Sequence, residues 1–301
     1  MARFLAIGEC MIEMARDPSG LYRAGVAGDT LNTAWYFRRA TRPNHWQVAY
    51  FTRVGRDRQS DRIVDFIAGA GIETEWISRD TERQPGLYMI DLDNGERSFT
   101  YWRSQSAARL LADDEARLRD AMAASDLIYF SGITLAILAP DRRDFLIALA
   151  GEARRDGKTV AFDPNIRPRL WENPEEMRRR IMQAAAAASI CLPSFDDERS
   201  AFADESIEAS ARRYLEAGSG EVVVKNAGGD VCVGDAGGIA VIGTLEQVKP
   251  VDTTGAGDSF NGGYLARRSG GASIKDSVIF AHEVASQVVR HHGALADIAV
   301  P

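Results

Sequence analysis

The chain has 301 residues, and its 36 basic and 43 acidic side chains give a formal net charge of −7. This balance argues against a protein that binds nucleic acid or a membrane surface through general positive charge. The three cysteines lie far apart and form no Cys-x-x-Cys, so neither a disulfide framework nor a zinc site is indicated. No apolar run is long enough for a membrane span, and the first residues lack a signal-peptide pattern, so we expect a cytoplasmic protein.

Short apolar segments of strand length recur along the chain and alternate with segments of helical periodicity. The predicted strands are Phe4–Ile7, Leu127–Phe130, Val160–Phe162, Ile190–Leu192, Val222–Val224 and Val231–Val233. The predicted helices include residues 141–156 and 173–188, where apolar residues recur with a period of about 3.6. This alternation is typical of an α/β protein with a mostly parallel, buried sheet.

A different pattern interrupts this alternation at residues 86–103. Two strand-like runs flank Asn94-Gly95, a dipeptide that strongly favours a β-hairpin turn. We expect one domain over residues 1–301, with a small β lid formed by residues about 10–30 and 85–105 that covers an active site. The alternative is an edge hairpin that only packs against the body.

One segment looks like a phosphate-binding P-loop but has the wrong spacing and context. Residues 151–159 place five residues between the two glycines, whereas the P-loop has four. A predicted helix precedes this segment and a predicted strand follows it, which reverses the order that a P-loop needs. We therefore interpret it as a helix-to-strand turn. The sequence also lacks a Gly-x-Gly-x-x-Gly fingerprint and a Gly-x-Ser-x-Gly nucleophile elbow.

The most informative segment is Asp252–Tyr264, which reads Asp-Thr-Thr-Gly-Ala-Gly-Asp-Ser-Phe-Asn-Gly-Gly-Tyr. Gly255, Ala256 and Gly257 can bring their backbone N–H groups close to an anion because no bulky side chain intervenes. A helix that begins near Asp258 would add the positive end of its dipole. Asp258 itself could accept a proton from an attacking hydroxyl group. The alternative is a glycine-rich turn in which Asp258 only caps the helix.

This segment resembles the C-terminal signature of the ribokinase-like (PfkB) carbohydrate kinases, and Ala27–Ala34 resembles their N-terminal signature. The resemblance implies a three-layer α/β/α body with a mostly parallel sheet and a small β lid. It also implies that Asp258 is the catalytic base and that the amides of Gly255, Ala256 and Gly257 form the anion hole. The partners it implies are ATP and a small sugar-like molecule, with no nucleic acid and no membrane, and it leaves a homo-oligomer open.

Within this family the chain most closely resembles the kinases that phosphorylate 2-keto-3-deoxygluconate on its C6 hydroxyl. The shared motifs lie at residues 8–13, 28–32, 85–88, 95–103, 131–138 and 163–171. By resemblance, the residues that contact the sugar acid are Gly28, Asp29, Asn32, Tyr88, Tyr101, Arg103, Arg167 and Asp258. Arginine offers a planar fork that suits a carboxylate, so Arg103 and Arg167 are the expected carboxylate ligands.

The resemblance also implies a nucleotide site with ATP and Mg²⁺. The residues expected there are Lys225, Gly228, Thr254, Gly255, Ala256, Gly257 and His282, with Ser286 beside His282. Two departures from the family pattern stand out. Ala227 occupies a position where relatives have glycine, and Ser194 replaces the asparagine of an Asn-x-x-Glu element whose acids survive at Asp196, Asp197 and Glu198. Mg²⁺ is expected because phosphates need a counter-charge, but the sequence does not identify its protein ligands.

Two alternative functions remain open. The first is a fructokinase, because fructokinases share the Asp-x-Asn-x-Arg-x-x-Leu-Trp motif seen at residues 163–171. Residues 8–13 and 28–32 together with Tyr88 favour the sugar acid, and a neutral ketose would leave a buried arginine without a partner, which is costly. The second is a non-catalytic sugar-acid sensor on the same fold. The intact Gly-Ala-Gly and Asp258 argue against a sensor, which has less need of a base.

Overall fold

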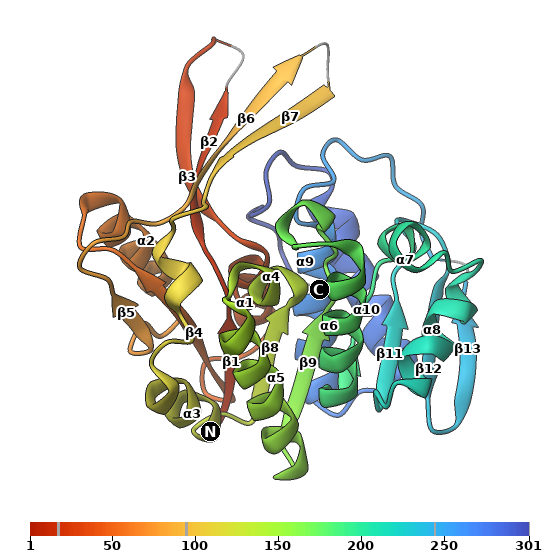
Figure 1. The fold of residues 1–301 in the computed structure, drawn as a ribbon. Helices are drawn as coiled ribbons and strands as arrows, with labels where there is room; N and C mark the ends of the chain where they lie inside the picture. The colour runs from red at the N-terminus through yellow and green to blue at the C-terminus, as the bar shows by residue number, and fades with distance from the viewer. Residues whose placement is uncertain (17–18, 94–95, 244, 301) are drawn as a thin grey trace.

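The computed structural model of the chain describes residues 1–16, 19–93, 96–243 and 245–300. Within these ranges, nine strands form one large sheet in the order β13-β12-β11-β10-β9-β8-β1-β4-β5. Another four strands form a small sheet in the order β3-β2-β6-β7. Figure 1 shows the small sheet standing above the body that contains the large sheet.

The large sheet is parallel from β5 to β11 and antiparallel at β12 and β13. Its strands are β1 (Ala2–Ile7), β4 (Trp46–Val54), β5 (Ile77–Arg79), β8 (Leu127–Ser131), β9 (Thr159–Asp163), β10 (Ile190–Cys191), β11 (Glu221–Val224), β12 (Val231–Asp235) and β13 (Gly238–Ile242). Every residue of β8 is buried, as expected for a parallel strand that helices cover on both faces. The predicted strands and the mostly parallel sheet are confirmed.

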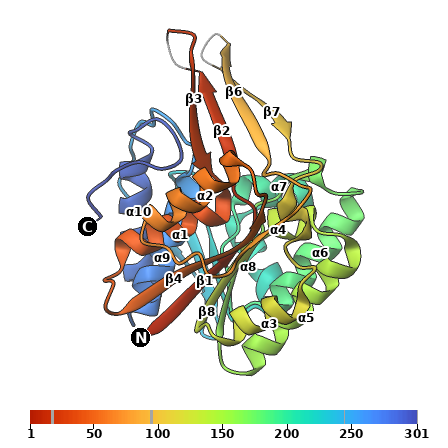
Figure 2. The same cartoon turned by 90° about the vertical axis from the view of Figure 1, so that its left-hand side faces the viewer.

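Helices cover the large sheet on both faces. They are α1 (Asp29–Ala40), α2 (Arg58–Gly69), α3 (Glu115–Ala123), α4 (Gly132–Ile137), α5 (Pro140–Arg155), α6 (Pro174–Ala187), α7 (Phe195–Phe202), α8 (Ile207–Glu216), α9 (Ala256–Ser269) and α10 (Ile274–Val288), with 3-10 turns η1 (Ala107–Leu110) and η2 (Pro168–Leu170). Figure 2 shows α1, α9 and α10 on one side of the sheet and α3, α5 and α6 on the other. The three-layer α/β/α body is therefore confirmed.

The two helices predicted at residues 141–156 and 173–188 correspond to α5 and α6. The start of α6 follows from local chemistry, because Oδ1 of Asn173 accepts a hydrogen bond from the backbone N–H of Glu176 at 2.8 Å. Between α5 and β9, Gly157 adopts a φ of 83°, which favours glycine. This segment is the predicted helix-to-strand turn and not a P-loop.

The small sheet consists of β2 (Met11–Arg16), β3 (Tyr22–Ala27), β6 (Leu87–Asp93) and β7 (Glu96–Trp102). Strands β6 and β7 pair antiparallel, with Tyr88 opposite Tyr101, so the predicted hairpin pairing is confirmed. Its turn at Asn94-Gly95 lies outside the described residues. The central pair, β2 and β6, is parallel and joins the two hairpins into one sheet, which we call the lid sheet.

The ends of several elements meet below the lid sheet. The carboxyl end of β9 carries Asp163, and the amino ends of α1 and α9 carry Asp29 and Asp258. Ligand sites in open α/β sheets generally lie at the carboxyl ends of the strands, so this edge is the expected place for a site. Among the described helices, none has the length and apolar character needed to cross a membrane.

Candidate active site

Asp258 lies in the first turn of α9, which begins at Ala256 and is preceded by Gly255 at the N-cap. The helix therefore begins two residues before the expected position, and the alternative in which Asp258 caps the helix is wrong. Gly255 adopts a φ of 76°, and a Cβ there would lie 2.5 Å from the carbonyl oxygen of Ala294. Both observations require glycine at this position, so the tight turn that places Asp258 depends on Gly255.

The carboxyl group of Asp258 is buried and has an unusual acidity. Burial is the main cause that raises its pKa to about 7, and the charge of Asp29 adds to the increase. Nδ2 of Asn32 donates a hydrogen bond to Oδ2 of Asp258 at 2.8 Å, which opposes the increase. A carboxylate with a pKa near neutrality is well matched to accepting a proton from an alcohol.

The amino end of α9 provides donors for an anion. The first N–H groups of a helix have no partner within the helix. Here the N–H of Ala256 donates to the carbonyl oxygen of Thr253 at 3.2 Å, and Gly257 supplies the next amide. A Cβ on Gly257 would lie 3.8 Å from Nζ of Lys225, so a fixed cation stands beside these amides. Ala256 and Gly257, two of the residues predicted to form an anion hole, therefore lie in the same turn of helix as Asp258.

Lys225 follows β11 and is held in a buried polar cluster. Its Nζ donates to Oδ1 of Asn261 at 2.9 Å and forms an ion pair with Oδ2 of Asp163 at 3.4 Å. Nδ2 of Asn261 in turn donates to Oδ2 of Asp163 at 2.7 Å. These contacts hold the ammonium group in one position, which suits a group that has to stabilise negative charge without moving.

The residues of the N-terminal signature gather around the same point. Nδ2 of Asn165 donates to Oδ2 of Asp29 at 2.8 Å. Burial raises the pKa of Asp29, while hydrogen bonds from Ser131 and Asn165 oppose the increase. Gly28 lies directly against the chain at Glu9, since a Cβ on Gly28 would be 2.3 Å from that carbonyl oxygen. Gly28, Asp29 and Asn32 are thereby brought next to Asp258.

The lid sheet carries two tyrosines that stand opposite each other on neighbouring strands. The rings of Tyr88 and Tyr101 lie 5.7 Å apart between centroids, and Tyr88 is 8% exposed whereas Tyr101 is 51% exposed. The hydroxyl of Tyr88 donates a hydrogen bond to Oε2 of Glu13. Burial and the charge of Glu13 raise the pKa of Tyr88, and the charge of Asp258 contributes as well, which places this hydroxyl within electrostatic reach of Asp258.

The two arginines expected to bind a carboxylate have different surroundings. Arg103 forms an ion pair through Nη2 with Oε2 of Glu9, and both side chains are largely buried. The expectation that a neutral ketose would leave a buried arginine without a partner is therefore wrong for Arg103. The side chain of Arg167 is half exposed, and its Nη1 lies 3.3 Å from Oδ2 of Asp197 on α7.

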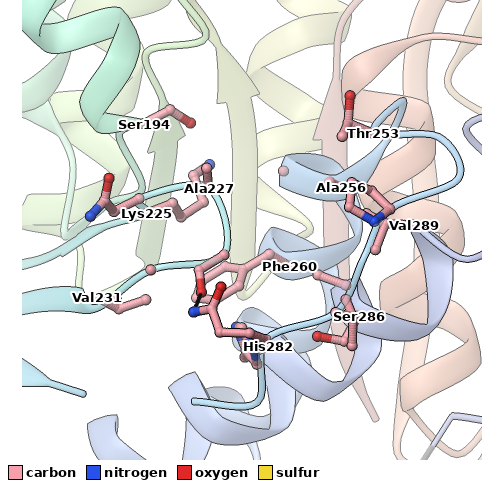
Figure 3. A pocket seen from close by; sticks show the side chains of 18 of the residues that line it. Ser194, Lys225, Ala227, Val231, Thr253, Ala256, Phe260, His282, Ser286 and Val289 are labelled. Carbon is pink, nitrogen blue, oxygen red and sulfur yellow. Dashed lines mark hydrogen bonds between the residues drawn. The ribbon is translucent and has the colours of Figure 1, made fainter. Parts of the chain in front are cut away.

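A cavity of about 410 Å³ lies on the other side of Lys225, between β11 and α10 (Figure 3). Its lining includes Ser194, Lys225, Asn226, Ala227, Gly228, Gly229, Glu246, Gln247, Val248, Pro250, Thr253, Ala256, Gly257, Phe260, His282, Ala285, Ser286 and Val289. Figure 3 shows His282, Ser286 and Val289 on one wall and Lys225 and Ala227 across from them. An apolar cavity with a few polar groups and a helix N-terminus at one end suits a nucleotide.

Most of the expected nucleotide residues line this cavity, namely Lys225, Gly228, Ala256, Gly257 and His282. Nε2 of His282 lies 2.7 Å from the carbonyl oxygen of Glu246, which fixes the ring against the cavity wall. Thr254 and Gly255 do not line it. The N–H and hydroxyl of Thr254 both donate to Oδ1 of Asp252, and Thr253 lines the cavity instead. Sequence reasoning cannot separate two adjacent threonines in a turn.

Ala227 adopts a φ of 45°, a left-handed conformation that favours glycine. This is the position where the sequence departs from the family pattern. The backbone keeps the shape that glycine would adopt, and Gly228 and Gly229 continue it along the cavity. The expected close approach of this backbone to a nucleotide is therefore compatible with the alanine.

Two acidic residues near Lys225, Asp163 and Asp197, offer the kind of ligand that a magnesium ion needs. Asp163 is paired with Lys225, and Asp197 is paired with Arg167. Burial raises the pKa of Asp197, and the charges of Arg167, Asp163 and Lys225 all act on it, so these groups lie close together. Among the described residues, no cluster of three or more acidic, histidine or cysteine side chains forms a metal cage. Both oxygens of Asp163 already accept hydrogen bonds, from the N–H of Asn165 and from Nδ2 of Asn261. This leaves Asp197 as the carboxylate that fits Mg²⁺ bound mainly by nucleotide phosphates and water.

Several residues of the site received no role from the sequence, among them Glu9, Glu13 and Asn261. Glu9 and Glu13 lie in the first motif, and the structure pairs them with Arg103 and Tyr88. Asn261 lies in the C-terminal signature, and the structure places it between Lys225 and Asp163. The only indication in the sequence that these residues belong to the site was their position in the two motifs. The partner of each is far away in the chain, so the sequence alone did not show what each one contacts.

Known proteins resemble the chain over nearly its whole length. A 2-dehydro-3-deoxygluconokinase of Escherichia coli is 39% identical over 299 residues, which cover 97% of this chain and 96% of the relative. A protein of the same name from Haemophilus influenzae is 36% identical over 306 residues, which cover 99% and 96%. The crystal structure of a fructokinase with bound ATP from Xylella fastidiosa has the same fold, with a TM-score of 0.83, 24% identity and coverage of 97% and 93%. The model of the pfkB family of carbohydrate kinases matches residues 1–300, and the chain belongs to this family.

Proposed function

We propose that the protein phosphorylates 2-keto-3-deoxygluconate with ATP, at the C6 hydroxyl, to give 2-keto-3-deoxy-6-phosphogluconate. Membership of the carbohydrate kinases supports the reaction type. Two relatives that bear the name 2-dehydro-3-deoxygluconokinase, 36% and 39% identical over nearly the full length, support the substrate. Asp29, Asn32 and Tyr88, which the sequence resemblance assigns to the sugar acid, all lie near Asp258.

The observation that carries the reaction type is the position of Asp258. Asp258 lies in the same turn of helix as the amides of Ala256 and Gly257, and its carboxyl group accepts a hydrogen bond from Asn32. A general base for phosphoryl transfer has to stand between the attacking hydroxyl and the group that stabilises the transferred phosphoryl. The contact of Asp258 with Asn32 and its place in the first turn of α9 support this role.

In the proposed mechanism the sugar acid binds below the lid sheet and ATP binds in the cavity beside α10. Asp258 accepts the proton of the C6 hydroxyl while that oxygen forms a bond to the γ-phosphorus of ATP. The bond between this phosphorus and the oxygen of the leaving ADP breaks. The amides of Gly255, Ala256 and Gly257 and the ammonium group of Lys225 stabilise the charge on the transferred phosphoryl group.

The remaining residues bind and orient the reactants. Arg103 and Arg167 bind the carboxylate, which directs the opposite end of the sugar acid toward Asp258. Tyr88 and Tyr101 cover the sugar and limit the access of water, which would otherwise accept the phosphoryl group. Mg²⁺, when bound with the nucleotide near Asp197, would supply positive charge for the phosphates.

The test is coupled ADP release from ATP and Mg²⁺ with four sugars: 2-keto-3-deoxygluconate, 2-keto-3-deoxygalactonate, fructose and ribose. We expect kcat/KM for one of the two keto-deoxy acids to exceed that for the neutral sugars by about 10²-fold or more. The better acid identifies the configuration that the site accepts at C4. A preference for fructose would assign the protein to the alternative function, and binding of the acid without turnover would favour a sensor.

A further inference from the structure

The ion pair between Glu9 and Arg103 lies where the chain crosses between the body and the lid sheet. Glu9 stands between β1 of the body and β2 of the lid sheet, and Arg103 directly follows β7, the last strand of the lid sheet. The side chain of Glu9 is 0% exposed and that of Arg103 is 11% exposed. A pair this deeply buried needs good geometry to offset the cost of removing both charges from water.

Two further crossings of the chain pack tightly around this pair. A Cβ on Gly86 would lie 3.0 Å from Oε1 of Glu9 and 3.1 Å from Cβ of Arg103. A Cβ on Gly28 would lie 2.3 Å from the carbonyl oxygen of Glu9. The four segments that join the body to the lid sheet therefore converge on the pair, and glycine at two of them makes the space for it.

The pair leaves hydrogen-bonding groups unused. Oε1 of Glu9 and Nε of Arg103 are both buried without a hydrogen-bond partner in the described part of the chain. The hydrogen bond that the guanidinium makes there runs from Nη2 to Glu9. Glu9 thus holds the guanidinium at Nη2, and none of the hydrogen bonds found among the described residues involves Nη1. Because the guanidinium group is planar and rigid, fixing it at Nη2 also fixes the direction in which Nη1 points.

We propose that Glu9 is a positioning residue: it holds the guanidinium of Arg103 so that Nη1 meets the carboxylate of the sugar acid. This inference rests on the proposed function. Glu9 does not touch the substrate and acts through Arg103. A guanidinium that is already oriented loses less freedom on binding, so Glu9 strengthens binding of the acid without taking part in phosphoryl transfer.

The test combines Glu9→Gln with Arg103→Gln, singly and together. The amide of the Glu9→Gln variant keeps the size of the side chain but removes the charge that holds the fork. We expect Glu9→Gln alone to raise KM for 2-keto-3-deoxygluconate about tenfold, with kcat and KM for ATP changed less than about twofold. In the Arg103→Gln background, Glu9→Gln should change KM for the acid less than about twofold, because the group it orients is gone.

A matched control lies at the other end of the strands, at the amino end of β11. Glu221 is a buried acid whose Oε2 pairs with Nη2 of Arg268 at 2.9 Å. Glu221→Gln should lower Tm and leave KM for the acid unchanged. If Glu9→Gln behaves like this control, or raises KM equally in both backgrounds, the pair is only structural and the inference is overturned. Should Glu9→Gln fail to fold, Glu9→Asp keeps the charge but draws it back by one methylene, and the same comparison applies.

The wild-type rate with the acid separates this inference from the proposed function. A wild type that turns over the acid, with variants that behave like Glu221→Gln, overturns the role of Glu9 alone. A wild type that turns over only neutral sugars overturns the proposed function, and with it the role of Glu9 in binding a carboxylate.

Discussion

Asn32 in the first turn of α1 donates a hydrogen bond to Asp258 in the first turn of α9, 226 residues away in the chain. This bond joins the N-terminal and C-terminal motifs of the sequence at one carboxyl group. A donor to a carboxylate stabilises its ionised form, and the hydrogen bond opposes the increase in pKa that burial causes. Asn32 therefore helps to keep Asp258 ionised near neutral pH.

The first prediction concerns the base itself. Asp258→Asn should lower kcat by roughly 10²–10⁴ and change KM for the sugar little, because the amide cannot accept the proton. In the wild type, kcat/KM should rise with pH and level off above about 7, the pKa of Asp258, since only the ionised form accepts a proton. Steady-state kinetics between pH 5 and pH 9 measure both effects. A variant with wild-type kcat would exclude Asp258 as the base.

The second prediction concerns Asn32. Asn32→Ala removes the hydrogen bond that lowers the pKa of Asp258, so the rising limb of kcat/KM should move to higher pH. Asn44→Ala, a change in an exposed loop, is the control and should leave the limb in place. The pH profiles of both variants with the same sugar provide the comparison. If kcat/KM of Asn32→Ala rises at the same pH as that of the wild type, the hydrogen bond does not control the ionisation of Asp258.

The third prediction concerns stability. The folded state raises the pKa of Asp258 from the ordinary 3.8 to about 7, so this group favours folding below pH 3.8 and loses that contribution as pH rises to about 7. Asp258→Asn does not ionise and avoids the loss. We expect the variant to be more stable than the wild type at pH 8, by on the order of 3 kcal/mol, and the difference to shrink toward pH 4. Denaturant unfolding at several pH values tests this, and a difference that does not vary with pH would contradict it.

The fold, and the two sequence motifs that meet at the site, were largely predictable from local sequence. Apolar runs such as Leu127–Phe130 are wholly buried strands, and their pattern reflects a sheet covered on both faces. The tight turn at the amino end of α9 was predictable because Gly255, Ala256 and Gly257 are small residues that allow close approach of the backbone. The start of α9 was misplaced by two residues, since Gly255 caps the helix by its φ and not by a side chain.

Long-range pairing was the part that the sequence did not reveal. Glu9 and Arg103 are 94 residues apart, and nothing in either segment shows that the charge of one will neutralise the other. The argument from an unpaired arginine failed for this reason. Thr254 was likewise assigned to the nucleotide, whereas the turn directs it to Asp252. Such errors arise because side-chain direction in turns and partner choice across the sheet depend on the tertiary fold.

The fourth prediction separates two roles of Lys225. Its ammonium group pairs with Asp163 and also stands 3.8 Å from where a Cβ on Gly257 would lie. Lys225→Met should lower kcat by roughly 10²–10³, because a fixed charge beside the transferred phosphoryl is lost. If the lysine only neutralised Asp163, the double variant Lys225→Met/Asp163→Asn would recover activity. We expect the double variant to remain slow.

Lys158→Met is the matched control for this experiment. Lys158 directly precedes β9, so it lies at the amino end of this strand and away from the site. Its Nζ donates to the carbonyl oxygens of Ala123 and Ser125 at 2.7 and 2.6 Å. Its replacement should lower Tm and leave kcat unchanged. Recovery of kcat in the double variant, to within about threefold of the wild type, would assign Lys225 a purely structural role.

The fifth prediction concerns the backbone at the nucleotide cavity. Ala227 is exposed and has a φ of 45°, so its methyl group contributes little packing and strains the backbone. Ala227→Gly should stabilise the protein by on the order of 1 kcal/mol, after allowance for the greater freedom of glycine in the unfolded chain. Ala217→Gly is the control, because Ala217 has a φ of −70° and glycine there should destabilise. Thermal unfolding of both variants, together with KM for ATP, measures the effect. If both variants are less stable than the wild type, Ala227 is not strained. If Ala227→Gly is more stable and Ala217→Gly less stable, with KM for ATP unchanged, the glycine of the family pattern is needed here for backbone shape and not for contact with the nucleotide.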